Sequence, residues 1–377
     1  YRGGGTVSLA LKELRRRPGR FGVATVILTL IAILLMFLGG LLDGLTAGNT
    51  GAIRAQQADL IVYSATSQDS LVRSRIDLSE RREIERVEGV EQAGEIGSVQ
   101  LGARIEGKGP RELVPVVLFG YEAASAGLPE TPARAGEAWA DDTLKAESVE
   151  TGETIRLGPA RSPIKVIGFV NDTRYSGQST LWASMETWRK VQNEHRPAAR
   201  VTPEISQALV IQAPGMDAAG LADRIDQATG DRTSSLTEDE AINALPGVSA
   251  QQSVFNQIIG LTVLIAIIVV ALFFALITVE RIGLYGVLKA LGAGSGSLFA
   301  GVVLQAVIVT LVASVIGGIA ALALDAVIPA GSIPFIATGS RLAGSTFFLL
   351  IAAVIGCAFS LRRVLKVDPA QAIGGGQ

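Results

Sequence analysis

Four long runs without charge limit what this chain can fold into. Residues 21–42 and 258–279 contain no acidic or basic side chain, and residues 298–324 and 342–361 form two more such runs. A helix of about 20 apolar residues, rising about 1.5 Å per residue, crosses a hydrocarbon core of about 30 Å. The sequence therefore predicts an α-helical membrane protein with four spans, one before and three after a long polar segment.

The first run has one alternative interpretation. A cleaved signal peptide is also basic and then apolar, but its apolar region is only about 7 to 15 residues long. Residues 21–42 exceed that length, which favours a retained span.

Charge divides the chain in two. Residues 43–257 hold 31 acidic and 21 basic residues, a net charge of −10, whereas the whole chain carries only −2. The remaining residues are therefore positive, and such asymmetry indicates two compartments.

Basic residues flank both ends of the spanning region: Lys12, Arg15, Arg16, Arg17 and Arg20 before the first span, and Arg362, Arg363 and Lys366 after the fourth. The loop between the third and fourth spans offers only Asp325 and Arg341. By the positive-inside rule both termini are cytoplasmic, and the acidic segment lies outside a plasma (inner) membrane.

These observations predict the following order: 1–20 amphipathic cytoplasmic helix, 21–42 first span, 43–257 extracytoplasmic domain, 258–279 second span, 280–297 cytoplasmic coupling helix or loop, 298–324 third span, 325–341 external loop, 342–361 fourth span, and 362–377 cytoplasmic tail. For the first of these segments, a simple basic stop signal remains the alternative. Pro18 would turn the chain into the bilayer.

The polar segment mixes strands and helices. Runs of β-branched and aromatic residues predict strands at 60–63, 116–119, 164–170 and 208–211. A helix is predicted at 80–88, with Ser79 as its N-cap and Glu83 near the capping-box position, and another at 221–228. The absence of a regular strand-helix alternation predicts an inserted α+β domain.

A short charged helix separates the second and third apolar runs. Arg281, Tyr285 and Lys289 share one face at helical spacing, opposite a leucine face. In a protein with little cytoplasmic surface, this turn is where a cytoplasmic partner can act, although an ordinary loop is the alternative.

The same stretch carries a resemblance. The pattern Glu-Arg-x-x-Glu-Ile-Gly-x-Leu-(Arg/Lys)-Ala-Leu-Gly-Ala is typical of permeases similar to MacB, LolC and FtsX. This chain matches it at Glu280, Arg281, Gly286, Leu288, Lys289, Ala290, Leu291, Gly292 and Ala293. The segments "VDPAQA", residues 367–372, and "GETIRLGPARSPIKVIGFV", residues 152–170, are also similar to the tail and outer domain of that family.

The resemblance implies a homodimeric permease that docks two copies of a cytoplasmic ABC ATPase through Glu280, Arg281, Tyr285 and Lys289. The family's second glutamate is replaced here by Leu284 or Tyr285, depending on the register, which puts its ion pair with the ATPase in doubt.

The chain itself is not expected to be an enzyme. It contains no G-x-x-x-x-G-K-[ST] phosphate loop, so ATP and Mg²⁺ would be bound by the partner ATPase. His195 is interpreted as a surface residue rather than a ligand or base, and the single Cys357 can form no intrachain disulfide or thiolate cluster. No metal site, resident cofactor or nucleic-acid-binding stripe is predicted.

An amphiphilic or hydrophobic cargo is expected, because the span interiors lack ionisable residues. The segment "ADLIVYSATSQDSLVRSRI", residues 58–76, looks most like the HrtB and DevC branch, which implies export of haem, the favoured cargo, or of glycolipid. Candidate substrate-binding residues are Met36, Asp43 and Tyr63, facing Asn256 and Gln257 at the start of the second span. Sulfur, carboxylate or phenolate could ligate haem iron. Met36 as a packing residue and Asp43 as a marker of the water interface remain open.

Two other functions stay open within the family. An FtsX-like member would transmit ATPase motion to an external cell-wall hydrolase, and a LolC-like member would release lipoproteins. Small-residue pairs predict close helix packing at Gly40 with Gly44, Ser314 with Gly318, and Gly317 with Ala321.

Overall fold

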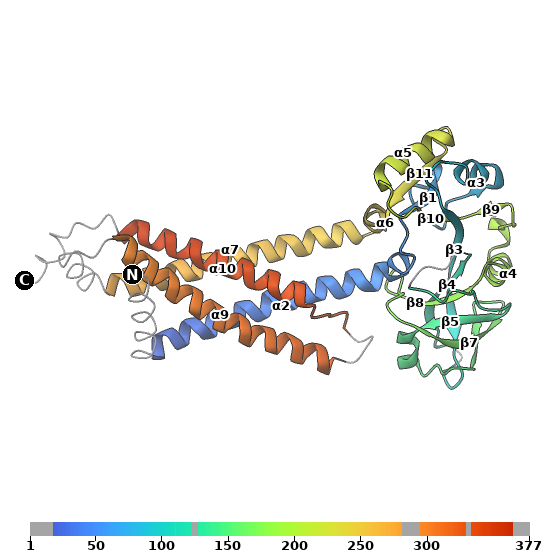
Figure 1. Cartoon of the computed structure of the whole chain (residues 1–377). Coiled ribbons are helices and arrows are strands. Elements are labelled where there is room, and N and C mark those ends of the chain that lie inside the picture. The colour runs from blue at the N-terminus through green and yellow to red at the C-terminus, as the bar shows by residue number, and fades with distance from the viewer. Residues whose placement is uncertain (1–17, 110, 123–126, 281–294, 329–332, 365–377) are drawn as a thin grey trace, which may run out of the picture. The chain divides into compact units, whose positions relative to one another are not determined.

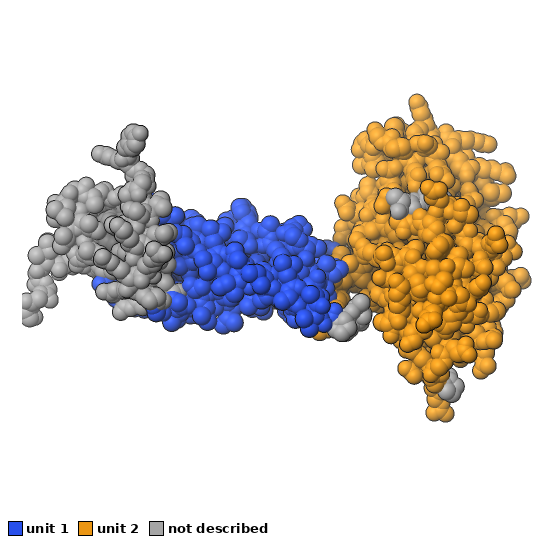
Figure 2. All heavy atoms as spheres, turned by 60° about the horizontal axis from the view of Figure 1, so that its bottom comes forward, with its two compact units in different colours: residues 1–43, 252–329, 335–377 blue, residues 44–251, 330–334 orange. Residues whose placement is uncertain are grey.

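The chain folds into two compact units, which Figure 2 colours separately. Unit 1 comprises residues 1–43, 252–329 and 335–377, and unit 2 comprises residues 44–251 and 330–334. The computed structural model describes residues 18–109, 111–122, 127–280, 295–328 and 333–364. Three predicted segments lie wholly or partly outside the described residues: residues 1–17 of the amphipathic helix, residues 281–294 of the coupling helix and residues 365–377 of the tail.

Four long helices contain the four predicted spans (Figure 1): α2 (Pro18–Arg54), α7 (Val248–Glu280), α9 (Ser295–Val327) and α10 (Gly339–Val364). Within the described residues, these four are long and apolar enough to cross a membrane. Their low amphipathicity has a physical reason, since lipid and helix neighbours are both apolar and no polar face is required.

The helices of unit 1 pack through small and branched side chains. One buried cluster joins Ala24 and Leu28 of α2 to Phe274 of α7, Ala306 of α9 and Cys357 of α10. Other side chains point outward, and their exposed apolar atoms suit contact with lipid: Leu30, Leu272, Leu276, Ile319 and Phe359.

Two helices continue past the predicted spans. α2 runs to Arg54 rather than ending near residue 42, and α7 begins at Val248 rather than near residue 258. The apolar run marks only the part of a helix that needs lipid. Polar turns continue in the helical conformation where other contacts hold them, as they do for the end of α2.

The sequence predicts Arg341 in the external loop, and the structure places it in the first turn of α10 instead. The reason is local. Thr338 precedes the helix, and its hydroxyl accepts the Arg341 backbone N–H at 3.3 Å, as an N-cap residue does.

Unit 2 is built on a nine-stranded mixed sheet in the order β11-β1-β10-β3-β4-β8-β5-β7-β6. Its strands are β1 (Leu60–Ser64), β3 (Gln92–Arg104), β4 (Val114–Tyr121), β5 (Glu137–Asp141), β6 (Thr154–Leu157), β7 (Ser162–Val170), β8 (Ser179–Ser184), β10 (Ala208–Gln212) and β11 (Thr233–Thr237). A separate pair joins β2 (Ile76–Asp77) to β9 (Ile205–Ser206).

Part of this sheet closes on itself. The long strand β3 pairs with β10 at one end and with β6 at the other, where Ala103 faces Leu157. The six strands from β3 to β6 therefore form a ring. Their inward side chains fill one core that includes Val116, Ala140 and Leu181.

The helices of unit 2 are α3 (Leu78–Ile84), α4 (Met185–His195), α5 (Ala218–Ala228) and α6 (Glu238–Ala244), with short 3₁₀ helices η1 (Ala65–Ser67), η2 (Asp142–Glu147) and η3 (Pro197–Ala199). α4 lies against strands β3 and β4 because two glycines leave room for its indole. A Cβ at Gly97 or Gly120 would lie within 2.6 Å of Trp188.

The predicted elements of unit 2 are found, and the helix predicted at 80–88 needs two corrections: its N-cap differs, and it ends at Ile84, four residues early. The four predicted strands lie within β1, β4, β7 and β10, and the predicted helix at 221–228 lies within α5. The N-cap prediction was wrong. The cap is Asp77, whose carboxylate accepts the N–H groups of Ser79 and Glu80 and forms a capping box with Glu80, so α3 begins at Leu78.

Candidate functional site

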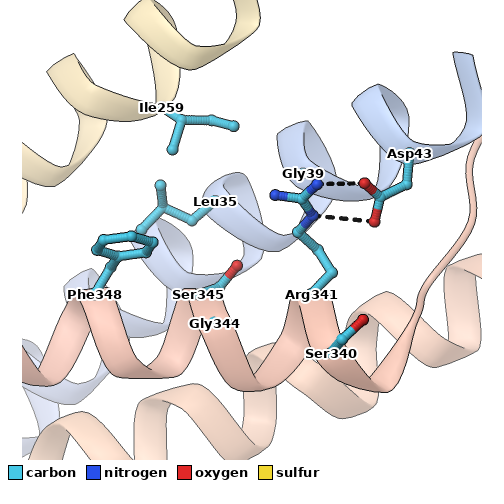
Figure 3. Close-up of a pocket in the computed structure, with 9 residues that line it drawn as sticks. All are labelled: Leu35, Gly39, Asp43, Ile259, Ser340, Arg341, Gly344, Ser345 and Phe348. Carbon is cyan, nitrogen blue, oxygen red and sulfur yellow. Dashed lines mark hydrogen bonds and ion pairs between the residues drawn. The ribbon is translucent and has the colours of Figure 1, made fainter. Parts of the chain in front are cut away.

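An acidic residue of α2 and a basic residue of α10 form an ion pair in unit 1. Arg341 donates from Nε to Asp43 Oδ2 at 3.0 Å, and its Nη2 donates to Asp43 Oδ1. Figure 3 shows the two parallel contacts, the fork geometry in which arginine binds a carboxylate bidentately. The side chains are 34% and 23% exposed, for Arg341 and Asp43 respectively, so the pair is neither fully buried nor free in solvent.

Two glycines of α2 make this pairing possible. A Cβ at Gly39 would lie 2.5 Å from Arg341 Cδ, so the stem of the arginine lies directly on the backbone of α2. A Cβ at Gly40 would lie 2.4 Å from Phe335 Cε2. The Gly40 carbonyl also accepts the Ile336 N–H at 3.1 Å, which fixes the segment that leads into α10.

Thr338 connects the cap of α10 with the ion pair. Its hydroxyl accepts the Arg341 N–H and lies 3.3 Å from Asp43 Oδ2 as a donor. Asp43 is thus held by both Thr338 and Arg341, which fixes the carboxylate and, through it, the guanidinium.

The ion pair lies on the wall of a pocket of about 250 Å³ in unit 1. Its lining comes from α2, α7 and α10: Leu35, Gly39, Asp43, Ile259, Ser340, Arg341, Gly344, Ser345 and Phe348. Apolar side chains form one side, with Leu35 nearly fully buried and Phe348 51% exposed. The pocket therefore joins a charged group to an apolar wall that continues to the surface of unit 1.

Of the predicted substrate-binding residues, only Asp43 lines this pocket. Met36 is 2% exposed and packs with Ala321 and Phe335, so it fills a core. Asn256 and Gln257 are exposed on α7, where Gln257 Nε2 donates to Ser253 Oγ at 3.3 Å.

Tyr63 belongs to unit 2, where it is 1% exposed in the core formed with Phe119 and Trp182. Burial raises the pKa of Tyr63 far above its ordinary value, with smaller contributions from Tyr175 and Asp69. The Tyr63 phenol therefore stays protonated, whereas tyrosine binds haem iron as the deprotonated phenolate.

Among the predicted coupling residues, Glu280 is the last residue of α7 and its side chain is exposed. Arg281, Tyr285 and Lys289 lie outside the described residues.

Sequence reasoning missed Arg341 as a site residue, although a signal was present. It is the only basic residue between Lys289 and Arg362, and Asp43 is equally isolated at the end of the first apolar run. Two lone opposite charges in apolar surroundings favour each other as partners, because neither is stable there unpaired.

One polar cluster of unit 2 resembles a hydrolase triad only in composition. Ser162 Oγ donates to Glu194 Oε2 at 2.5 Å and lies 3.1 Å from His195 Nε2. In a triad the carboxylate accepts a hydrogen bond from the histidine and orients it, whereas here Glu194 accepts the hydrogen bond of the Ser162 hydroxyl and does not orient His195. The described residues contain no group of three metal-ligating side chains.

Comparison with known proteins finds similarity to permeases. Residues 256–369 match the model of the FtsX-like permease C-terminal domain. The chain is 24% identical over 378 residues to a hemin transport system permease protein, HrtB, of Staphylococcus haemolyticus, covering 98% of this chain and 99% of the relative. It is 26% identical over 385 residues to an uncharacterized ABC transporter permease of Mycobacterium tuberculosis, covering 97% and 99%.

The periplasmic region of MacB from Actinobacillus actinomycetemcomitans is similar at a TM-score of 0.34 and 10% identity, over 52% of this chain and 92% of that chain. A likeness at this level carries no conclusion about ligands or partners. The match to the FtsX-like permease model and the similarity to two relatives agree: residues 256–369 carry an FtsX-like permease C-terminal domain, and the chain is similar over nearly its whole length to permeases of transport systems.

Proposed function

We propose that the chain is the permease subunit of an ATP-driven exporter, which moves an amphiphilic or hydrophobic molecule, with haem favoured, from the membrane outward. An ABC permease works with an ATPase subunit. We propose two copies of that subunit, a homodimer of permeases in the plasma (inner) membrane, and contact with membrane lipid.

Charge supports the orientation of the chain. Basic residues flank the first and fourth spans, whereas residues 43–257 carry a net charge of −10. The positive-inside rule therefore places both termini in the cytoplasm and unit 2 outside.

The pocket at Asp43 and Arg341 is the observation that carries the export proposal. It combines an apolar wall, including Leu35 and Phe348, with a fixed charged group, and it lies among helices that can cross a membrane. A site of this composition suits a molecule that has both an apolar body and a polar group.

The named relatives support haem as the favoured cargo, because two HrtB proteins match over 98% of this chain. The iron ligands suggested by the sequence do not support recognition through the metal. Met36 and Tyr63 are buried in separate cores, and Asp43 is occupied by Arg341. Haem recognition would therefore depend on its apolar faces and its carboxylates.

A reconstituted complex tests this function. The tagged permease, with the ATPase that copurifies with it, would be placed in lipid nanodiscs, and ATP hydrolysis measured as hemin is added. We expect saturable stimulation by hemin that the ATPase alone does not show. A rate of ATP hydrolysis that does not change when hemin or another amphiphile is added would contradict export and favour an FtsX-like transmitter of motion.

A further inference from the structure

We infer that the pocket in unit 1 binds the anionic headgroup of an amphiphile, through the part of the Arg341 guanidinium that Asp43 leaves free. This inference rests on the proposed function and specifies the class of molecule that the site takes. It assigns Arg341 as the residue that determines specificity, and Asp43 as the residue that positions it.

The first step is the direction of the donors. Arginine carries five N–H donors, and the contacts with Asp43 involve only Nε and Nη2. Among the described residues, no hydrogen bond involves Nη1. Figure 3 shows the remaining nitrogen directed away from Asp43, toward the side of the pocket where Leu35 lies. Two N–H donors on a cation are therefore available to a ligand in the pocket.

The second step is the surroundings of these donors. Leu35, Ile259 and Phe348 line the same pocket and offer no acceptor. Ser340 and Ser345 also line it, and neither hydroxyl forms a hydrogen bond with Arg341 among the described residues. A charged donor facing apolar side chains is costly unless an acceptor reaches it. A carboxylate or phosphate oxygen suits it best, because hydrogen bonds between charged groups are about twice as strong as neutral ones.

The third step is size. A pocket of about 250 Å³ is smaller than the sites that enclose drug-sized ligands, which start at about 300 Å³. It can take a headgroup and the first part of an apolar body, while the rest of the ligand lies along the exposed face of Phe348. A small inorganic anion would not use this apolar wall.

The role of Asp43 gives the inference its sharpest test. If Asp43 only positions Arg341, then Asp43→Asn keeps an oxygen acceptor beside the guanidinium and removes the competing negative charge. Binding of an anionic ligand should then persist or strengthen, whereas Arg341→Gln should abolish it. A merely structural ion pair predicts that both variants lose binding together.

The experiment uses the full-length permease in phosphatidylcholine nanodiscs, without ATP. Palmitic acid carrying a diazirine and its methyl ester are the probes, and cross-links are mapped to peptides containing Leu35, Ile259 or Phe348. We expect the acid to label these peptides about tenfold more than the ester, in keeping with a charge-assisted hydrogen bond. In Arg341→Gln we expect the acid to fall to the level of the ester, and in Asp43→Asn we expect no loss.

Equal labelling by acid and ester, unchanged labelling in Arg341→Gln, or parallel loss in both variants would overturn the inference. Competition identifies the source of the headgroup. Protection by phosphatidylglycerol indicates a membrane lipid, protection by hemin indicates a hydrophobic carboxylic acid, and protection by neither overturns the assignment. The assay needs no ATPase, so its failure is distinct from a failure of hemin to stimulate ATP hydrolysis.

Discussion

The guanidinium of Arg54, the last residue of α2, lies 2.8 Å from the carboxylate of Asp172 in the connection between β7 and β8. The same connection forms three backbone hydrogen bonds with the end of the helix. Ala52 donates to Arg174, and Asn49 and Gly48 accept from Ser176 and Gly177, at 3.0 to 3.1 Å. The end of α2 is thus fixed to the sheet of unit 2, so we expect movement of this helix to reach the sheet.

Gly51→Ala should weaken this attachment. The added Cβ would lie 2.6 Å from the Asp172 carbonyl oxygen and 2.9 Å from the Arg174 nitrogen, and backbone atoms cannot move aside as side chains do. We expect a loss of about 1–3 kcal/mol in the stability of unit 2, as for other overpacked sites. Tryptophan fluorescence during urea unfolding of the full chain measures it, because Trp139, Trp182 and Trp188, the three tryptophans, all lie in unit 2.

Gly48→Ala is the matched control, one helical turn earlier. Its Cβ would meet only the Arg174 guanidinium, with Nη1 at 3.5 Å and Cζ at 3.7 Å, which are ordinary contacts. Alanine also favours a helix by up to about 1 kcal/mol over glycine, so stability should hold or rise. Arg54→Ala should cost less than about 1 kcal/mol, because the pair is 35% and 59% exposed. Equal stability of the two glycine variants would argue against the attachment.

Glu95 should make the stability of unit 2 depend on pH. It lies on β3 with its side chain 2% exposed, and Oε2 contacts Arg189 of α4. Burial raises the pKa of Glu95 from 4.5 to about 6, although Arg189 opposes the rise. The folded protein therefore holds this proton more tightly than the unfolded chain. The stabilisation is complete below about pH 4.5 and is lost as the pH rises through 6, by about 2 kcal/mol.

Glu95→Gln should remove this dependence. Tryptophan-monitored unfolding from pH 4 to 7 would show a flatter profile than the wild type over the window of about 4.5 to 6. Glu91→Gln removes an exposed carboxylate near the start of the same strand and serves as the control. Parallel profiles for wild type and Glu95→Gln would show that Glu95 does not titrate in this range.

The sequence predicted the elements that depend on local composition. The four apolar runs and strands such as β4 and β10 follow from the residues themselves. The ring closure does not, because it depends on pairing Ala103 with Leu157, far apart in the chain. Strand β11, with the sequence TSSLT, has no apolar run and is specified by its pairing with β1.

The candidate site was predicted only in part for a similar reason. Asp43 could be proposed because it interrupts apolar sequence. Its partner Arg341 could be proposed only by pairing two isolated charges across a long separation. Met36 and Tyr63 carry atoms that can bind iron, but both side chains are buried, and burial depends on tertiary packing that the sequence does not show.

Gly39→Ala should change the shape of the pocket while both charged residues, Asp43 and Arg341, remain in the sequence. The new Cβ would lie 2.5 Å from Arg341 Cδ, so the arginine has to shift away from Asp43. We expect the hemin concentration for half-maximal ATPase stimulation to rise about fivefold, equivalent to about 1 kcal/mol. Gly344→Ala is the control, because it lines the same pocket and its Cβ meets no atom within 4 Å. The same rise in both variants would show that displacement of Arg341 is not the cause.

Two adjacent glycines of α9 test the helix packing of unit 1. A Cβ at Gly317 would lie 2.9 Å from Ala32 Cβ and 3.3 Å from the Ile33 nitrogen of α2, whereas a Cβ at Gly318 meets nothing within 4 Å. Gly317→Ala should therefore cost about 1–3 kcal/mol and Gly318→Ala much less. Cys357, the only cysteine, is fully buried in unit 1, so a thiol-reactive dye reports thermal unfolding there. Equal melting temperatures for Gly317→Ala and Gly318→Ala would contradict the close contact between α2 and α9 at Gly317.

The last prediction concerns the proposed contact with the ATPase. The sequence predicts that Arg281 and Lys289, eight residues apart, share one face of a helix with Tyr285. Replacing both bases with glutamate would reverse two charges on that face, so we expect the copurified ATPase and its hemin-stimulated turnover to fall about tenfold or more. Arg86→Glu with Arg111→Glu makes the same change in charge on exposed positions of unit 2 and should leave both quantities unchanged. Undiminished copurification and turnover after reversal at Arg281 and Lys289 would exclude these two bases from the docking contact, whatever the cargo proves to be.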